Sequence, residues 1–466
     1  MHETISFGTS GWRGVIAEEV TFPRLRKLTR AITRYLKDNE QDRQGIVIGY
    51  DTRFFSSEFA REVACVSLEE GIEVVISDTP SPTPVISFEI LRRKAGGGIN
   101  ITASHNPYYY SGVKFSPAWG GPAEPEVTRI IEKNYLNALP DKPREDYAYY
   151  IKKGKIEAYN PIPTYLSALR QVIPFSLDFT FKVVFDPLYG TSIPYLKTIF
   201  KGRKNVSLIH KKYDPFFGGL EPVPYEHILI DLKKQVKRNS ALLGLALDGD
   251  ADRFGVISHD GTFITPNEVF SILAYHLGKR GQAGIGRTVS TTRMLDVIAK
   301  HHQVKLLETP VGFKYLGALI RDGQIYLGGE ESGGLSIKGW VPEKDGILAV
   351  LLVLGLCAEQ NIPPAVLIDD LYKIFGKFYN QRVDIKFSER QANKVRDFID
   401  NFSETTFFGL KIKAISRKDG LLITFEDLSW CLLRQSGTEN MIRFYYESQD
   451  KEVYEVFEHS TLPFLA

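Results

Sequence analysis

The sequence predicts an α/β fold of four domains, in which three similar α/β units with mixed, mainly parallel sheets precede a C-terminal α+β domain. Three observations support this prediction. The chain has 466 residues, which is too many for a single hydrophobic core, so three or four domains are expected. Apolar, strand-like segments alternate with helix-like segments, which is typical of parallel sheets covered by helices. Near residue 375 this alternation gives way to a series of short strands.

The first unit shows the alternation most clearly. Its expected elements are a helix over 21–37, a strand over 46–50, a helix over 56–70, a strand over 72–76, a helix over 82–93 and a strand from 98. The strand and polar turn of 46–53 resemble in pattern the segments 183–192 and 287–294. Three units of one design are therefore expected, as repeats that match in pattern rather than in identity. The predicted domains are 1–150, 151–258, 259–374 and 375–466.

The last domain is predicted to pair short strands with two helices. Its expected elements are strands over 381–387, 410–416, 421–425, 430–433 and 442–446, a helix over 389–401 and a helix at the C-terminus. Asp419-Gly420 is a strong hairpin signal between two of the strands.

Composition excludes several classes of protein. The formal net charge is only +2, whereas nucleic-acid and membrane-surface proteins need a basic excess, so neither partner is expected. The three cysteines, Cys65, Cys357 and Cys431, are far apart in apolar surroundings and predict buried thiols in a reducing compartment. No basic segment followed by an apolar run opens the chain, so a cytoplasmic location is expected. The apolar stretch 347–357 is too short to span a bilayer and predicts a buried helix.

The segment Gly98–Pro107 reads Gly-Ile-Asn-Ile-Thr-Ala-Ser-His-Asn-Pro. It begins as a buried strand, and Asn-Pro forces a turn at its end. Ser104 and His105 are therefore placed on a loop at a strand end, where α/β proteins carry their chemistry. Taken alone, the segment is better interpreted as an ordinary turn; the motifs further along the chain favour a functional loop.

An acidic loop follows a second predicted buried strand. Asp248, Asp250 and Asp252 alternate in Asp-Gly-Asp-Ala-Asp-Arg, which includes Arg253. Three carboxylates beside a buried strand are costly unless a cation neutralises them, and a hard divalent cation with oxygen ligands suits them. The loop is not an EF-hand, because Arg253 and His259 stand where Gly and Glu are required. A solvated acidic turn is the alternative interpretation.

Five further loops carry polar residues suited to anions or sugars. Arg13 lies in a glycine-rich loop and has the forked donors that phosphate prefers. Gly328–Gly334 combines acids, a hydroxyl and glycines, which suits hydrogen bonds to sugar hydroxyls. The remaining candidates are Gly312 and Lys314 after a strand, Lys344 at a helix start, and the phosphate-binding nest Arg434, Ser436, Gly437 and Thr438.

Taken together, these motifs resemble the α-D-phosphohexomutase superfamily, the phosphoglucomutases and phosphomannomutases. Five motifs occur in the family's order and spacing along nearly the whole chain: Gly-Thr-Ser-Gly-Trp-Arg-Gly, Thr-Ala-Ser-His-Asn-Pro, Asp-Gly-Asp-Ala-Asp-Arg, Gly-Glu-Glu-Ser-Gly and Arg-Gln-Ser-Gly-Thr-Glu. The resemblance implies four domains around a central cleft. It also implies a Mg²⁺-dependent enzyme that transfers a phosphoryl group within a hexose phosphate.

The resemblance implies a role for each candidate residue. Ser104 would carry the phosphoryl group and complete a Mg²⁺ site on Asp248, Asp250 and Asp252. Lys114 would be a general acid or base, with Arg13 and His105 flanking the reacting phosphate. Glu330 and Ser332 would hold sugar hydroxyls. The other substrate-binding residues would be Arg253, Gly312, Lys314 and Lys344, with Arg434, Ser436, Gly437 and Thr438 on the far phosphate.

The chain departs from many family members at a few positions. Gly334 stands where phosphomannomutase-type members have His, and Gln435 and Asn440 stand where proline is usual. Gly-Phe-Lys at 312–314 and Lys-Asp-Gly at 344–346 resemble the glucose-directed members.

The leading hypothesis is therefore a phosphoglucomutase that converts glucose 1-phosphate to glucose 6-phosphate, with glucose 1,6-bisphosphate as intermediate and activator. Phosphomannomutase, phosphoglucosamine mutase, phosphopentomutase and glucose-1,6-bisphosphate synthase are alternatives, as are a Mg²⁺ phosphatase and a non-enzymatic sugar-phosphate sensor. The expected partners are small sugar phosphates, and either a monomer or a dimer is compatible with the sequence.

Overall fold

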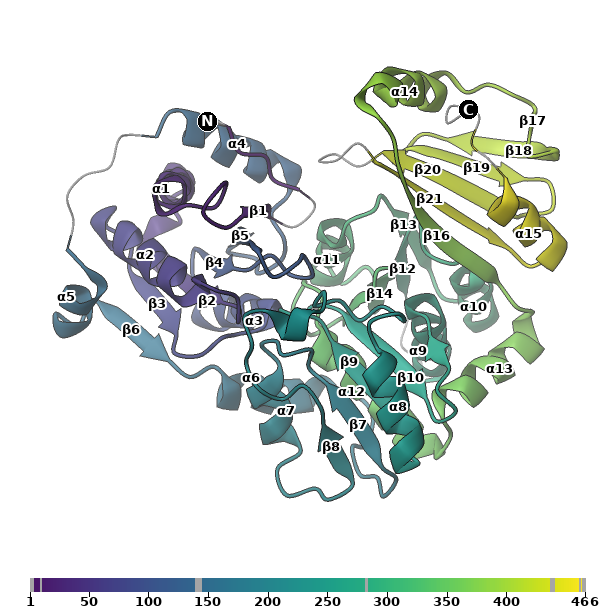
Figure 1. Cartoon of the computed structure of the whole chain (residues 1–466), viewed down its shortest axis with the longest axis horizontal. Helices are drawn as coiled ribbons and strands as arrows, with labels where there is room; N and C mark the ends of the chain where they lie inside the picture. The colour runs from purple at the N-terminus through teal and green to yellow at the C-terminus, as the bar shows by residue number, and fades with distance from the viewer. Residues whose placement is uncertain are drawn as a thin grey trace.

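The computed structural model describes residues 4–8, 11–138, 145–280, 284–435, 441–460 and 462. The described chain contains four β-sheets, one in each of four successive units (Figure 1). Three of the units contain mixed sheets and the fourth contains an antiparallel sheet, as the sequence predicts.

The first unit is a six-stranded sheet with helices. Its strands in spatial order are β1 (Trp12–Val15), β5 (Tyr110–Pro117), β4 (Gly97–Ile101), β2 (Ile46–Tyr50), β3 (Val74–Ser77) and β6 (Ile156–Tyr159). Its helices are α1 (Phe22–Asp38), α2 (Ser56–Glu69), α3 (Thr83–Arg93), α4 (Pro125–Leu136) and α5 (Tyr147–Lys152), with a 3₁₀ turn, η1 (Asp42–Gln44). Thr21 caps α1 by accepting a hydrogen bond from the Arg24 amide, and Pro23 fits its first turn.

The second unit is a five-stranded sheet. Its strands in spatial order are β11 (Phe263–Ile264), β10 (Phe254–Ser258), β9 (Leu243–Leu247), β7 (Val183–Asp186) and β8 (Val206–Leu208). Its helices are α6 (Ile162–Val172), α7 (Ile193–Ile199) and α8 (Ile230–Asn239), with a 3₁₀ turn, η2 (Phe217–Gly219).

The third unit is a four-stranded sheet. Its strands in spatial order are β13 (Leu306–Thr309), β12 (Ile285–Thr288), β14 (Leu327–Glu330) and β15 (Gly334–Ile337). Its helices are α9 (Pro266–Lys279), α10 (Met294–His302), α11 (Phe313–Arg321), α12 (Gly346–Gln360) and α13 (Pro364–Phe375). A capping box between Thr265 and Glu268 starts α9.

The first three units share one strand order. Each unit contains four strands in the same spatial sequence: β5-β4-β2-β3, β10-β9-β7-β8 and β15-β14-β12-β13. Of these four, the two that come last in the chain form an antiparallel hairpin: β4 with β5, β9 with β10, and β14 with β15. The first strands are β2, β7 and β12, which belong to the three segments whose sequences resemble one another. The prediction of one repeated design therefore agrees with the topology.

This common order places the functional loops at one equivalent position. Ser104 follows β4, the three aspartates follow β9, and Glu331 and Ser332 follow β14, so each motif lies in the third-to-fourth strand loop of its unit. The sequence analysis did not predict β5, β10 or β15, the strands that complete these hairpins.

The fourth unit is an antiparallel sheet with two helices. Its strands in spatial order are β16 (Tyr379–Lys386), β21 (Met441–Ser448), β20 (Trp430–Gln435), β19 (Leu421–Phe425), β18 (Leu410–Ser416) and β17 (Thr406–Phe407). Its helices are α14 (Ala392–Asn401), preceded by the 3₁₀ turn η3 (Glu389–Gln391), and α15 (Lys451–His459). Asp419-Gly420 lies between β18 and β19, as predicted.

Two strands lie beyond the predicted domain boundaries. β6 follows residue 150 but pairs with β3 of the first sheet, because the chain adds one more parallel strand before leaving it. β11 follows residue 258 but pairs with β10, so Asp260-Gly261 is a hairpin turn inside the second sheet. The sheets of the first and second units thus extend to Tyr159 and Ile264.

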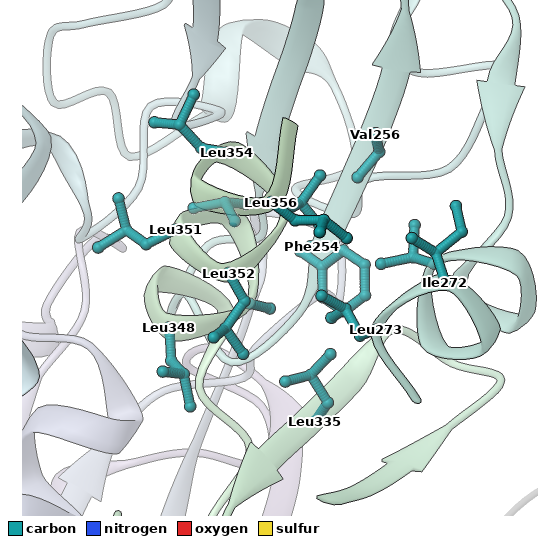
Figure 2. Close-up of a cluster of buried hydrophobic side chains, with 14 of the residues drawn as sticks. Phe254, Val256, Ile272, Leu273, Leu335, Leu348, Leu351, Leu352, Leu354 and Leu356 are labelled. Carbon is teal, nitrogen blue, oxygen red and sulfur yellow. The ribbon is translucent and has the colours of Figure 1, made fainter. Parts of the chain in front are cut away.

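The predicted apolar helix is α12, which lies at the centre of the largest core. Figure 2 shows Leu348, Leu352 and Leu356 of α12 among side chains of the neighbouring strands and of α9. Cys357 is also buried on this helix, and Cys65 and Cys431 are buried elsewhere. Among the described residues, no single helix is long and apolar enough to cross a bilayer; α12 and α13 together pass that test but are bent by 80°.

Three units meet at the start of α12. Asp345 caps the helix by accepting a hydrogen bond from the Leu348 amide. Its Oδ2 also accepts from the Tyr165 hydroxyl of the second unit at 2.6 Å and from Trp340 Nε1 at 2.8 Å. Phe88 of the first unit stacks on Trp340 with ring centroids 5.5 Å apart. This junction fixes the three hairpin loops relative to one another.

A buried carboxyl joins the third and fourth units. Glu447 on β21 accepts hydrogen bonds from the Arg293 amide at 2.7 Å and from Trp430 Nε1 at 2.9 Å. Burial raises its pKa to about 7, and hydrogen bonds from Thr292 and Trp430 only partly oppose this shift. Its Oε2 has no further partner among the described residues.

Glu447 should make stability depend on pH. Because its pKa is raised from 4.5 to about 7 on folding, its contribution is fully present below pH 4.5 and is lost as the pH rises through 7. Glu447→Gln should remove this dependence, so the variant should gain up to about 3 kcal/mol relative to the wild type between pH 4 and pH 8. Urea unfolding at several pH values measures it. Glu458→Gln, at an exposed site on α15, is the control; a Glu447→Gln difference that is constant with pH would contradict the assignment.

Candidate active site

The Ser104 loop joins β4 to β5. Ser104 is 1% exposed and has a φ of 53°, a left-handed conformation that non-glycine residues seldom adopt. Its amide donates to Thr102 Oγ1 at 2.8 Å, and its Oγ lies 3.3 Å from Asp248 Oδ2. The hydroxyl on the first unit therefore faces the acidic loop of the second.

The acidic loop joins β9 to β10. Asp248, Asp250 and Asp252 are at most 1% exposed, and one oxygen of each lies within 4.8 Å of the others. Asp248 Oδ1 accepts from the Arg253 amide at 3.0 Å, which closes the turn. Ala251 has a φ of 53°, like Ser104. Strained backbone of this kind persists where the surroundings hold it firmly, and it is common at functional sites.

Lysines from two other units neutralise this loop. Lys114 Nζ donates to Asp250 Oδ2 at 2.6 Å and to Asp252 Oδ2 at 2.8 Å. Lys344 Nζ lies 3.3 Å from Asp252 Oδ2 and 3.0 Å from Glu343 Oε1. The aspartates, Lys114 and Lys344 thus come from the second, first and third units.

Burial and neighbouring charges shift the pKa values of these groups. Burial, with Asp252 and Asp250 nearby, raises the pKa of Asp248 well above its usual value. Burial also acts to raise the pKa of Asp252, but the neighbouring Lys114 and Lys344 outweigh it and lower that pKa. Burial opposes the charge of Lys114, but Asp250 and Asp252 prevail and raise its pKa. Lys114 is therefore held as a cation.

The acidic loop fits a hard divalent cation. Asp250 Oδ1 and Asp252 Oδ1 are buried without a hydrogen-bond partner among the described residues, although buried polar atoms are normally satisfied. Together with Asp248 and the Ser104 hydroxyl they provide an all-oxygen set, which magnesium prefers. The three aspartates could therefore bind a metal ion.

Arg13 and His105 lie beside this centre. Arg13 Nη1 donates to Asn106 Oδ1 at 2.6 Å, which ties β1 to the serine loop. Burial and the neighbouring Arg253 lower the pKa of Arg13 to about 10. Burial, Arg253 and Arg13 lower the pKa of His105 well below its usual value, so its imidazole is neutral. Arg253 Nε lies 3.8 Å from Asp252 Oδ1.

The Gly328–Gly334 loop lies across from the acidic loop in the third unit. Glu330 Oε1 accepts from the Gly312 amide at 2.9 Å, and the Phe254 amide of the second unit donates to the Gly333 carbonyl at 3.1 Å. Burial raises the pKa of Glu330 to about 7, with Lys344 opposing. Ser332 is partly buried in the turn between β14 and β15.

Arg434 lies at the end of β20 in the fourth unit. Its Nε donates to both oxygens of Asp419 at 3.0 Å, and Asp419 Oδ2 accepts from the Val311 amide at 2.7 Å. Burial and the charge of Arg434 lower the pKa of Lys314. Arg434 and Lys314 therefore face the same region. Ser436, Gly437 and Thr438 lie outside the described residues.

The sequence analysis missed several residues at this centre. Thr83 Oγ1 donates to Asp250 Oδ2 at 2.5 Å and accepts from Asn100 Nδ2 at 2.9 Å. Thr83 starts α3 and carries no local signal, because only the fold brings that helix to the acidic loop. Asn106 lies inside the Ser-His-Asn-Pro motif, so its position was a usable signal. Glu343 is adjacent to the predicted Lys344, so its position in the sequence was also a usable signal.

Comparison with known proteins agrees with this geometry. Four family models match in order: phosphoglucomutase/phosphomannomutase α/β/α domain I over residues 4–141, domain II over 163–261, domain III over 265–375, and the C-terminal domain over 380–461. The chain belongs to the phosphoglucomutase/phosphomannomutase family. It is accordingly a member of the α-D-phosphohexomutase superfamily, whose enzymes are phosphotransferase-type isomerases of hexose phosphates.

Individual relatives carry different sugar names. The chain is 32% identical to a probable phosphoglucosamine mutase of Pyrococcus horikoshii, covering 96% of this chain and 95% of that protein. It is 28% identical to a phosphoglucomutase of Komagataeibacter xylinus, covering 96% and 88%. A putative phosphomannomutase structure from Thermus thermophilus matches with a TM-score of 0.82 and 30% identity, covering 97% of both chains. This phosphohexomutase thus resembles enzymes named for three sugars about equally.

Replacing one aspartate should weaken metal binding. Asp250→Asn removes one of the carboxylates, and a divalent cation should then bind more than about tenfold more weakly, because losing even an indirect partner of a metal site commonly costs that much. Titration with Mn²⁺ followed by electron paramagnetic resonance measures this affinity. The matched control is Asp178→Asn, whose side chain is 94% exposed. Equal Mn²⁺ affinity in the wild type and Asp250→Asn would rule out the site.

Proposed function

We propose that this phosphohexomutase interconverts glucose 1-phosphate and glucose 6-phosphate through a phosphoserine at Ser104 and a bisphosphorylated sugar. The observation that supports it best is the 3.3 Å separation between Ser104 Oγ and Asp248 Oδ2 inside a buried acidic trio. A phosphoryl group on that oxygen would lie against the carboxylates, where it must share a cation with them. A serine on an ordinary turn would have no such neighbours.

The acidic trio and Ser104 would hold Mg²⁺ as the cofactor. Bound there, the ion supplies charge neutralisation for the phosphoryl group. Arg13 adds forked donors beside the same loop, and Lys114, held protonated by Asp250 and Asp252, is in the state that gives a proton to the departing serine oxygen. Phosphoryl transfer depends mainly on such positioning and electrostatics.

The far end of the substrate is assigned to the third and fourth units. Glu330 and Ser332 would bind sugar hydroxyls, and the Gly312 amide, which donates to Glu330 Oε1 at 2.9 Å, brings the Gly312–Lys314 segment to the same loop. Arg434, with the loop Ser436 to Thr438, would hold the phosphate that is not transferred. The bisphosphorylated sugar would then turn around and return its other phosphate to Ser104, with glucose 1,6-bisphosphate also serving as activator.

Gly334 supports the preference for glucose over mannose phosphates. A Cβ atom on Gly334 would lie 2.2 Å from Lys344 Cδ and 2.6 Å from its Cγ, so the lysine stem occupies the space of any side chain there. The histidine found at this position in phosphomannomutase-type members cannot coexist with Lys344 in its present place. The Lys344 stem thus takes the place of an imidazole beside the sugar loop, while its ammonium group contacts Asp252 and Glu343.

Replacing the phosphoserine should abolish turnover. Ser104→Ala should lower kcat for glucose 1-phosphate by more than about 10⁴-fold, because the group that carries the phosphoryl is absent. A coupled assay with a trace of glucose 1,6-bisphosphate measures the activity. Intact-mass analysis should find one phosphate on the wild type and none on Ser104→Ala. The control is Ser57→Ala, on the exposed face of α2.

The same assay separates the alternatives. A sugar-phosphate sensor would show no turnover and would bind equally with Ser104→Ala. A phosphatase would release inorganic phosphate instead of forming the 6-phosphate.

A comparison of substrates tests which sugar phosphate the enzyme prefers. Glucose 1-phosphate should give a higher kcat/KM than mannose 1-phosphate, glucosamine 1-phosphate or ribose 1-phosphate, because Lys344 replaces the imidazole. Gly334→Ala should lower kcat/KM for glucose 1-phosphate by displacing Lys344 from Asp252. A wide margin in favour of mannose 1-phosphate would refute the preference and leave the mutase assignment intact.

A further inference from the structure

Arg53 binds the backbone of the serine loop with its whole guanidinium group. Nη2 donates to the carbonyls of Ser104 at 2.7 Å and Asn106 at 2.6 Å. Nη1 donates to the carbonyls of Pro107 at 2.6 Å and Tyr110 at 3.1 Å. Nε donates to Asp51, so all five N–H groups of the side chain are used. Four of the five acceptors lie in the seven residues that begin with Ser104.

Arg53 is itself held in place by burial, by an ion pair with Asp51 and by an aromatic ring. Its side chain is 0% exposed, and its counter-ion Asp51 also accepts from the Arg53 amide at 3.0 Å and from the Ser56 hydroxyl at 2.6 Å. The ring of Phe217, from the second unit, lies over the guanidinium at 4.9 Å. A buried charge with this degree of pairing is costly to disturb, so the arginine is a rigid support.

The serine loop needs such a support. Ser104 has a φ of 53°, which costs an L-residue free energy that its surroundings must offset. The loop also lies against the acidic loop, since a Cβ on Gly249 would come within 3.0 Å of the Ser104 carbonyl oxygen. The same carbonyl accepts from Arg53, so a small rotation of this peptide would move Ser104 Oγ relative to Asp248.

The second unit provides an internal comparison. Asp186 ends β7 as Asp51 follows β2, and its Oδ1 accepts from the Leu188 amide two residues later, as Asp51 does from Arg53. Asp186 is paired with His210, at 3.0 Å, and no arginine bonds to Asp186 among the residues that the structure describes. The turn itself is therefore common to both units. The arginine that bonds to the neighbouring loop is found at this turn in the unit that carries the serine.

We infer that Arg53 is the positioning residue that holds Ser104 in its left-handed turn, with Oγ aimed at the acidic trio. The inference rests on the proposed function. Arg53 acts through the backbone of the serine loop, so it should govern phosphoryl transfer to and from Ser104 and leave substrate binding by the third and fourth units unchanged. Lysine cannot replace it, because a single nitrogen cannot reach four carbonyls and a carboxylate at once.

Arg53→Lys tests the inference directly. Its kcat for the preferred hexose phosphate should fall by about 100-fold, since a misplacement of about 1 Å costs that much, while KM stays within about twofold. The rate at which glucose 1,6-bisphosphate phosphorylates the dephospho-enzyme, followed by intact mass, should fall by the same factor. Thermal unfolding identifies a variant that has not folded.

Two further variants keep the test decisive. Arg61→Lys, on the exposed face of α2, should behave as the wild type. Asp51→Asn places an amide donor opposite Arg53 Nε and should lower kcat in the same way; it decides the question if Arg53→Lys does not fold.

The possible failures are distinguishable. A wild type that isomerises no hexose phosphate refutes the proposed function. An active wild type with a folded Arg53→Lys or Asp51→Asn whose kcat is within threefold overturns the role of Arg53. So does a variant whose KM rises while kcat and the phosphorylation rate are unchanged.

Discussion

Three buried carboxylates on one loop are the constraint on which the arrangement of the molecule depends. Asp248, Asp250 and Asp252 are removed from water, and carboxylates without partners in such a place would be very unfavourable. Lys114 from the first unit and Lys344 from the third supply opposite charges at hydrogen-bond or near hydrogen-bond distance. The loop therefore stays buried and charged only while three units are docked around it, and the centre forms at their junction.

The repeated topology explains how these groups come together. In each of the first three units the third and fourth strands of the shared order form an antiparallel hairpin, and the loop of that hairpin carries Ser104, the three aspartates, or Glu331 and Ser332. Because the loops are equivalent, docking the units brings three different sets of polar side chains to one place. Phe88, Tyr165, Trp340 and Asp345 hold this docking beneath the loops. The repeat provides a common scaffold, and each unit has its own loop.

The fourth unit is joined to the third through a small number of buried polar contacts. Asp419 bridges Arg434 and the Val311 amide, next to Gly312 and Lys314. Glu447 accepts hydrogen bonds from the Arg293 amide and from Trp430 Nε1. These contacts place Arg434, which is proposed to hold the far phosphate, near Gly312, whose amide donates to Glu330. A substrate held at both ends would therefore experience any movement of the fourth unit as a change in the distance between its two phosphate sites.

Much of the fold and the site could be predicted from local sequence. The strand over 46–50, the buried helix over 347–357 and the order of four domains follow from periodicity and length, which are properties of short segments. Ser104 and the aspartates were found because unusual residues stand at strand ends. Their roles, and those of Ser436 to Thr438, stay predictions, the latter because these residues lie outside the described structure.

The sequence by itself determined which loops are candidates for chemistry and that they belong to repeated α/β units, since motifs and hydrophobic periods are local. Only the tertiary structure decided which side chains contact one another at the site. Thr83 meets Asp250, Lys344 covers Gly334, and Arg53 binds four carbonyls of a loop about fifty residues away. The strands β6 and β11, which extend two sheets past the predicted domain boundaries, were decided in the same way. These features depend on contacts between distant segments, and no short stretch of the chain contains both partners.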